Sequence, residues 1–160
     1  MILVNVVENR YHLRMAETQT AWSERALAEL RSAGYRRGVA RGRVIDYLER
    51  QECCVAAQEI HRALSSQGER IGLASVYRVL EMLVDKRLVQ RVDLGDGIAR
   101  FEAVRGSVEH HHHLVCDDCG KIEAFADQRL ERVLRDVEAN SGYAVAGHDI
   151  VLRGACASCR

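Results

Sequence analysis

Cysteine and histidine residues carry the most specific chemical signal in this sequence. Four of the six cysteines form two C-x-x-C pairs, Cys116/Cys119 and Cys156/Cys159. Each pair spans one tight turn that points both thiolates at one ion, and four thiolates close a tetrahedron around zinc. Because such a site has no open coordination position, we predict a structural zinc that contributes on the order of 10 kcal/mol to folding. A redox dithiol is the alternative interpretation of the pairs.

Four consecutive histidines, His110 to His113, precede the first cysteine pair. Side chains alternate between the two faces of an extended strand, so His110 and His112 point one way and His111 and His113 the other. We therefore predict that the run supplies half of each of two separate metal sites. A solvated polar strand is the alternative, whereas an expression tag fits poorly because the run is short and internal.

Carboxylate and imidazole groups elsewhere in the chain can complete both sites, because they are ordinary ligands of zinc and iron. One group of candidates lies on a predicted helix and the last predicted strand, and another lies at the end of a predicted hairpin. The first set is His110, His112, Glu131 and His148, and the second is Glu102, His111 and His113. A site that uses Glu102 would join the two halves of the chain.

Helical periodicity dominates the first half of the chain. Apolar residues recur at helical spacing in four segments, several of which end at glycine. These segments are 22–34, 39–50, 56–68 and 73–88. Two alternating runs, 88–94 and 98–104, then flank the turn sequence Gly-Asp-Gly, a pattern typical of a hairpin. Short helices followed by a two-stranded wing predict a winged helix-turn-helix domain over residues 21–104.

Polar and basic side chains in this half suit a nucleic-acid partner. Ser75, Tyr77 and Arg78 occupy outward positions near the start of the fourth predicted helix, the end that enters a major groove in this type of domain. A basic cluster upstream suits phosphate or minor-groove contact. That cluster consists of Arg36, Arg37, Arg41 and Arg43. A solvated charged face is the alternative for both groups.

The second half has a different pattern. Residues 105–109 form a predicted linker, and residues 110–160 follow the order strand, strand, helix, strand. The predicted helix, 128–142, is amphipathic and ends at a glycine. A sheet this small usually pairs with a second copy. The whole chain is therefore predicted to be α+β, with a C-terminal α/β dimerisation and metal-binding domain.

Charge and hydropathy narrow the class of protein further. Lysine and arginine together number 23, as do aspartate and glutamate, but basic residues dominate the first half and acidic residues the second. This asymmetry favours a polyanionic partner for the first half. No apolar run approaches the length of a membrane span, and residues 1–20 lack the features of a secretory signal. We expect residues 1–20 to be an N-terminal extension and the protein to be cytoplasmic.

Three stretches of the sequence resemble the ferric uptake regulator (Fur) family of bacterial metal-dependent repressors. They are GERIGLASVYRVLEMLVDKRLV, FEAV and HHHHLVCDDCGKIEAF, and the similarity covers roughly residues 21–160. The resemblance implies a homodimer with a winged-helix DNA-binding domain, an α/β dimerisation domain and a structural zinc held by the two C-x-x-C pairs. It also implies DNA contacts from Arg36, Arg37, Tyr77 and Arg78.

The resemblance further implies two other metal sites. The regulatory site corresponds to Cys54, Glu102, His111 and His113, and the site in the dimerisation domain to His110, His112, Glu131 and His148. Cys54 stands where iron-sensing members commonly have His, and His112 where they often have Asp. Soft thiolate and imidazole ligands favour zinc. However, the cysteine that zinc sensors often carry just before the histidine run is missing here, which keeps iron as the alternative.

We therefore predict a zinc-responsive transcriptional repressor of metal-uptake genes that binds operator DNA as a homodimer, without a membrane or a small-molecule substrate other than metal ions. The alternatives are an iron-responsive or peroxide-sensing repressor of the same family, and a zinc-stabilised interaction module that senses nothing. A zinc hydrolase or deaminase is disfavoured, because the chain contains no proline and no H-E-x-x-H motif. We expect no enzymatic activity.

Overall fold

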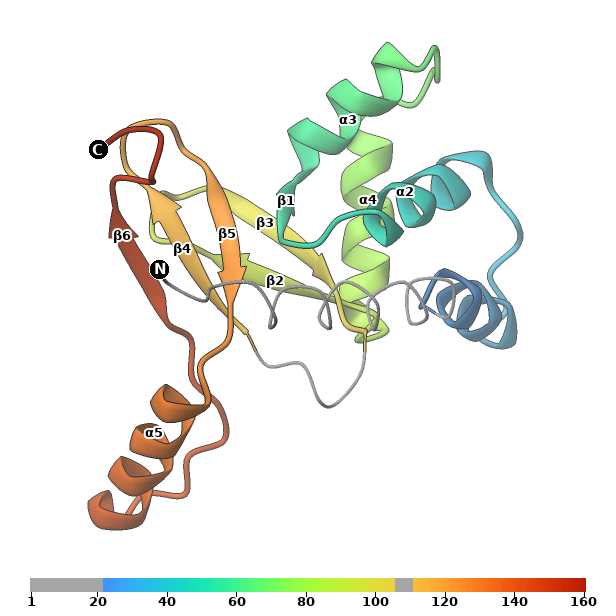
Figure 1. Ribbon diagram of the computed structural model, residues 1–160. Helices are drawn as coiled ribbons and strands as arrows, with labels where there is room; N and C mark the ends of the chain where they lie inside the picture. Colours follow the sequence, from blue (N-terminus) through green and yellow to red (C-terminus); the bar gives the residue numbers. More distant parts are fainter. Residues whose placement is uncertain (1–21, 106–110) are drawn as a thin grey trace, which may run out of the picture. The chain divides into compact units, whose positions relative to one another are not determined.

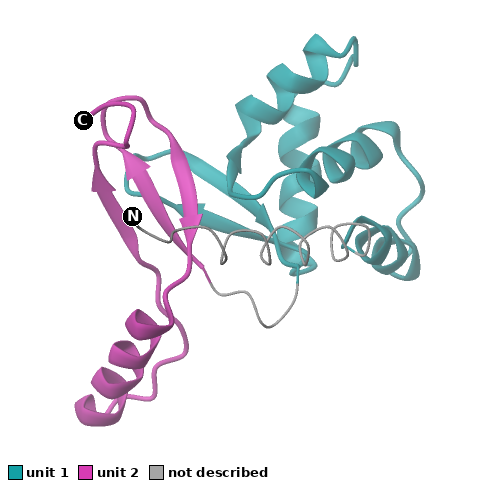
Figure 2. Cartoon of the chain, viewed as in Figure 1, with its two compact units in different colours: residues 1–106 teal, residues 107–160 magenta. Residues whose placement is uncertain are grey.

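A computed structural model describes residues 22–105 and 111–160 of the chain. The chain forms two compact units, residues 1–106 and 107–160, which are coloured separately in Figure 2. Each unit contains one three-stranded sheet and at least one helix, so the predicted α+β class is confirmed (Figure 1). The predicted extension, 1–20, and most of the predicted linker, 105–109, lie outside the described residues. No helix in the described part of the chain is long and apolar enough to cross a membrane.

The first unit contains the predicted helices and the predicted hairpin. In chain order, it has helical residues 22–32, α2 (Val39–Glu49), β1 (Val55–Ala56), α3 (Ala57–Ser66), α4 (Leu73–Asp85), β2 (Val89–Asp93) and β3 (Ala99–Ala103). Strand β1 was not predicted, because two residues are too few to show alternation. It pairs antiparallel with β3, with Val55 opposite Phe101, and the sheet order is β1-β3-β2.

An apolar core holds the first unit together. The apolar stripes of the helices converge on it, and Leu30, Ile45, Leu80 and Phe101 are each no more than 1% exposed. Trp22 joins the core through its ring, while its indole Nε1 donates a hydrogen bond to the carbonyl of Leu88 at 3.1 Å. The buried indole is thus satisfied as well as packed.

Arg105 ties the end of the hairpin to the end of helix α2. Its guanidinium donates to the carbonyl oxygens of Leu48, Glu49 and Gln51 at 3.1, 2.8 and 2.8 Å. The last carbonyls of a helix lack partners within the helix, and a cation there also complements the helix dipole. Arg105 therefore fixes the chain between α2 and β1.

The second unit follows the predicted order of strand, strand, helix and strand. It comprises β4 (His112–Cys116), β5 (Ile122–Phe125), α5 (Gln128–Ser141) and β6 (Val151–Gly154). Strand β4 lies at the centre, antiparallel to β5 and parallel to β6. Asp127 caps α5 by accepting from the backbone N–H of Arg129 at 2.7 Å, and Gly142 ends it in the left-handed conformation at φ 74°.

The last strand is shorter than the sequence pattern indicated. Alternation over residues 143–154 predicted one continuous strand, but only its last four residues pair with β4. The earlier residues run back beside α5, where the backbone N–H of Val145 donates to the Glu138 carboxylate at 3.2 Å. A side chain of the helix thus takes a donor that a strand would have used in its ladder.

Candidate metal centres and nucleic-acid interface

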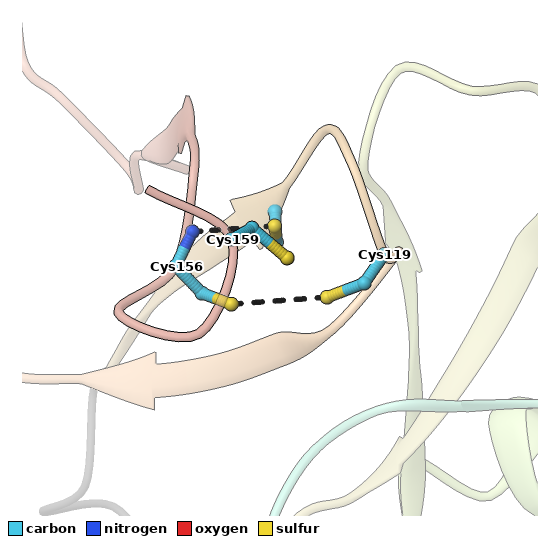
Figure 3. A group of neighbouring side chains, drawn as sticks. Cys119, Cys156 and Cys159 are labelled. Atoms are coloured by element: carbon cyan, nitrogen blue, oxygen red, sulfur yellow. Dashed lines mark hydrogen bonds between the residues drawn. The ribbon is translucent and has the colours of Figure 1, made fainter.

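The two C-x-x-C pairs come together at one end of the second sheet. The sulfurs of Cys116, Cys119, Cys156 and Cys159 all lie within 4.8 Å of one another. In Figure 3, the side chains of Cys119, Cys156 and Cys159 point toward a common centre, and the sulfurs of Cys119 and Cys156 are 3.8 Å apart. Four sulfurs at this spacing are the donor set of a closed, structural zinc site.

Strand pairing explains how residues so distant in sequence meet. Cys116 is the last residue of β4 and lies opposite Gly154 in the parallel ladder with β6, so the chain leaves β6 next to the first pair. The turn after Cys116 closes through Gly120, whose φ of 73° suits glycine, and whose N–H donates to the Cys116 carbonyl at 2.9 Å. The Cys159 N–H closes the second turn on the Cys156 carbonyl, also at 2.9 Å.

Backbone donors also prepare the cluster for a cation. The N–H groups of Cys119 and Cys156 hydrogen-bond to the Cys116 sulfur and lower the pKa of Cys116 to about 6. The N–H of Cys156 is 3.2 Å from that sulfur. The thiolate is the form that binds metal, so these hydrogen bonds favour Cys116 as a ligand, whereas hydrogen bonds with the neighbouring sulfurs raise the pKa of Cys159 to about 12.

A second group of ligands lies between β4, α5 and the chain before β6. The Nε2 atom of His112 is 2.8 Å from Glu131 Oε1, and His148 Nε2 is 3.6 Å from the same oxygen. Candidate ligand atoms of the three residues all lie within 4.8 Å of one another. His112 is 1% exposed, so its imidazole is held within the unit. Two nitrogens and a carboxylate suit zinc or iron. The fourth residue predicted for this site, His110, lies outside the described residues.

The predicted regulatory ligands form one pair in each unit. In the first unit, Cys54 directly precedes β1 and Glu102 follows Phe101 in β3, the residue that pairs with Val55. Both residues are buried, and Gln90 Nε2 donates to the Glu102 carboxylate at 3.1 Å. In the second unit, the rings of His111 and His113 lie 5.3 Å apart. They are alternate residues, and the ring of His112 between them contacts that of His148 instead.

One nearby group was missed at the level of sequence. Cys53 donates a hydrogen bond to the sulfur of Cys54, 4.0 Å away. This hydrogen bond and burial together raise the pKa of Cys54. The two adjacent cysteines in the sequence could have indicated this thiol pair. Among the cysteines, only the C-x-x-C pairs and Cys54 were predicted as metal ligands.

The residues predicted to contact DNA lie in the first unit. Tyr77 is half-buried, packs edge-on against Phe101 and accepts a hydrogen bond on its hydroxyl from Gln58 Nε2 at 3.0 Å. Arg78 is exposed and donates to the Ser75 hydroxyl at 3.0 Å. Ser75, Tyr77 and Arg78 all lie in the first half of α4, and part of the Tyr77 side chain packs against the apolar core.

The basic segment before α2 is open to solvent. Arg36 and Arg37 are both exposed, and they follow Tyr35. The guanidinium of Arg41 and the ammonium of Lys86 lie over the Tyr35 ring, at 5.2 and 5.7 Å from its centroid. Arg43 pairs with Glu69 at 2.7 Å. Two of the four predicted cations thus already have partners on the protein, while the charges of Arg36 and Arg37 face solvent.

Comparison of the sequence with known proteins identifies a family for this chain. The model of the ferric uptake regulator family matches residues 32–153. The ferric uptake regulation protein of Vibrio anguillarum is 36% identical over 135 residues, which cover 82% of this chain and 89% of that protein. The protein of the same name from Bacillus subtilis is 30% identical over 138 residues, covering 85% and 93%.

Solved structures give the same result. The crystal structure of the Vibrio cholerae ferric uptake regulator superposes with a TM-score of 0.70 at 34% identity, covering 79% of this chain and 96% of that one. The Helicobacter pylori regulator, described as having three functional metal-binding sites, superposes with a TM-score of 0.76 at 25% identity, covering 88% and 93%. The match therefore extends over both units, and the chain belongs to the ferric uptake regulator family of metal-responsive transcriptional regulators.

Proposed function

We propose that this protein is a zinc-responsive repressor that binds operator DNA as a homodimer and controls genes for metal uptake. The observation that carries the proposal is the division of the predicted regulatory ligands between the two units. Cys54 and Glu102 belong to the unit with the winged-helix elements, whereas His111 and His113 belong to the other. A metal ion with ligands from both pairs would cross-link the two units.

Such a cross-link would select one orientation of the DNA-binding unit. The rings of His111 and His113 lie 5.3 Å apart in the second unit, and Cys54 and Glu102 are neighbours of the paired residues Val55 and Phe101 in the first. To shift a two-state equilibrium from 1:99 to 99:1, a ligand must favour one state by about 5.5 kcal/mol. A four-ligand site present in only one orientation can supply that difference. In a dimer, the fixed orientation would set the separation of the two reading helices to suit half-sites on one DNA face.

The contact with DNA would come from α4 and the basic segment before α2. Arg78 near the start of α4 can reach a base edge or a phosphate, and Arg36 and Arg37 can neutralise phosphates. Tyr77 would add a hydroxyl from a half-buried ring. The dimer would cover the apolar side chains that the second unit leaves exposed, which include Val133 and Val137 of α5 at 57% and 59% exposure. The same proposal gives the chain no catalytic role.

The choice of zinc rests on the ligand types. Cys54 would add a soft thiolate to the two imidazoles and the carboxylate of the regulatory site, a set that favours zinc over iron. Iron is the second candidate, because the curated relatives with 30–36% identity are named ferric uptake regulation proteins. Ligand chemistry and relatedness thus point to different metals, which a metal titration distinguishes.

The test is metal-dependent binding to a selected duplex. A random-sequence duplex library is enriched with zinc-loaded protein, and the selected duplex is titrated by fluorescence anisotropy. The protein is first treated with a mild chelator that leaves the four-cysteine zinc in place, and then receives zinc, ferrous iron or manganese at buffered free concentrations. We expect zinc to raise DNA affinity at least 100-fold. Equal affinity of stripped and loaded protein would reject metal sensing and leave a zinc-stabilised interaction module.

Two variants locate the effect. Glu102→Gln removes a charge from the predicted regulatory set and should abolish the response to metal while leaving the weak, metal-free affinity unchanged. Glu123→Gln, on the exposed face of β5, is the matched control and should respond like the wild type. If ferrous iron acts at a lower free concentration relative to its cellular level than zinc, the repressor is an iron sensor.

A further inference from the structure

The two adjacent cysteines of the first unit have a geometry that suits a reagent with one atom that binds two sulfurs. The sulfurs of Cys53 and Cys54 are 4.0 Å apart, and both thiols are reduced. Both sulfurs lie on the same short segment between α2 and β1, so one reagent can reach both. Neither residue belongs to the four-cysteine cluster.

The chain on both sides of the pair is held by hydrogen bonds. Before it, Arg105 binds the carbonyl of Gln51 at 2.8 Å. After it, the backbone N–H of Ala56 donates to the Glu59 carboxylate at 2.7 Å, and Val55 pairs with Phe101. The two thiols are therefore presented on a fixed segment, which lowers the conformational entropy lost when both are bound at once.

A disulfide is a poor product for this pair. Neighbouring Cα atoms across a trans peptide are about 3.8 Å apart, whereas disulfides usually need about 4.4–6.8 Å. Closing the sulfurs from 4.0 Å to a bond of about 2.05 Å would therefore strain the segment that Arg105 and β3 hold in place. A single atom that bridges the sulfurs without joining them directly avoids this strain.

We infer that Cys53 and Cys54 form a dithiol site for trivalent arsenicals that carry two exchangeable hydroxyl groups, such as the hydrate of phenylarsine oxide. Both S–H bonds and both As–O bonds break, and two As–S bonds form. The two thiol protons leave with the oxygens as two molecules of water, and arsenic remains trivalent, so no oxidant or reductant is needed. Thiolate sulfur is the soft ligand type that such an ion prefers.

Occupation of the site would have a consequence for regulation, and this part alone rests on the proposed function. Cys54 cannot be a ligand of the sensed metal while its sulfur is bonded to arsenic. An arsenical would therefore compete with the metal at the regulatory site and release the operator. Formation of the adduct itself requires only the dithiol, so it can be measured whether or not the protein senses metal.

The experiment uses the full-length protein with its four-cysteine zinc in place. The protein is treated with one equivalent of phenylarsine oxide, challenged with excess glutathione and measured by native mass spectrometry, with zinc counted in the same spectrum. We expect the wild type to retain one phenylarsenic group that a dithiol such as dimercaptopropanol removes. Cys53→Ser should lose the group to glutathione, because one thiol cannot chelate, and should reduce retention at least tenfold with zinc still bound.

Cys54→Ser is the second variant at the pair. It should lose the group to glutathione as Cys53→Ser does, with zinc still bound. If Cys53→Ser retains the adduct as well as the wild type does, or if adduct formation is accompanied by loss of zinc, the arsenical binds the four-cysteine cluster and the inference is wrong. Unchanged operator binding by the wild-type adduct would instead reject the role of Cys54 in the regulatory site while leaving the dithiol site intact.

Discussion

The two units of this protein are stabilised by different means. In the first, most buried side chains are apolar, with Trp22, Ile45, Leu83 and Phe101 each 1% exposed or less. In the second, the described residues that become buried are His112, His113 and Cys116, all of them candidate metal ligands, and α5 buries no residue at all. Apolar burial stabilises by about 25 cal/mol per Å², a contribution that the second unit largely lacks. We therefore expect this unit to depend on bound metal and on the cover that a second copy would provide.

This difference assigns separate roles to the units. A unit with its own core keeps its shape whatever the metal supply, so the residues predicted to contact DNA stay in place relative to one another. A unit stabilised by coordination depends on its ligands. The contrast can be tested by perturbing each source of stability in turn and observing which unit responds.

Removal of the four-cysteine zinc should have the largest effect. A structural zinc contributes on the order of 10 kcal/mol, more than the net stability of many small domains, so a strong chelator should unfold the second unit and spare the first. Amide NMR should show loss of dispersed signals from 111–160 and retention of those from 22–105. Cys119→Ser should act in the same way and Cys53→Ser should not. A second unit that stays folded after complete zinc removal would contradict the comparison.

A cavity in the apolar core should affect only the first unit. Leu83 is 0% exposed, and Leu83→Ala should lower the free energy of unfolding of that unit by about 2–5 kcal/mol. Urea titration followed by the fluorescence of Trp22, the one tryptophan of the chain, reports this unit directly. The loss should be the same with and without zinc. Val39→Ala, at 73% exposure, is the control and should change little.

Loss of the Arg105 guanidinium should destabilise the first unit by a smaller amount. Arg105→Ala leaves the three carbonyls of the α2 terminus without their shared donor, and hydrogen bonds to charged groups contribute about 1.5–3 kcal/mol. Arg105→Lys keeps the charge but not the planar set of donors, and should recover part of the loss. The same urea titration measures both variants. A stability equal to that of the wild type would mean that water satisfies these carbonyls equally well.

The smallest effect is expected at the site of His112, Glu131 and His148, where the change is in metal affinity. Glu131→Gln should weaken binding of the second metal equivalent at least about tenfold, the size expected even for loss of an outer-shell partner, while the four-cysteine zinc stays bound. Competition with a chromophoric chelator and elemental analysis measure both. Glu123→Gln, whose carboxylate pairs with Lys121 at 2.6 Å on the surface, should bind metal like the wild type. Equal loss in both variants would indicate non-specific electrostatics.

Patterns local in the sequence predicted most of the fold. Helical spacing identified α2, α3 and α4, and the Gly-Asp-Gly turn identified the β2–β3 hairpin, because each is decided by residues close to one another along the chain. Strand alternation likewise separated the environment of His112 from that of His111 and His113. Local pattern could not identify the two-residue strand β1, and it extended β6 too far, since pairing partners distant in sequence decide where a strand stops.

Features that depend on distant contacts were not predictable in the same way. The hydrogen bonds of Arg105 to Leu48 and its neighbours span more than 50 residues, and no periodicity indicates them. The proximity of His112, Glu131 and His148 was proposed from ligand chemistry, but their distances follow from the way α5 leads back to β6. Cys53 and Cys54 are adjacent in the sequence, but only the structure gives the distance between their sulfurs.

The parallel pairing of β4 with β6 has a consequence for the order of events during synthesis. Since Cys156 and Cys159 follow β6, the four-cysteine cluster cannot close until the ribosome has released nearly all of the second unit. At about 5–20 residues per second, the winged-helix unit would be outside the exit tunnel on the order of seconds earlier. The first unit of a nascent chain would therefore be folded before the second unit can bind zinc. If a single first unit binds DNA only weakly, incomplete chains would not occupy DNA sites during this interval.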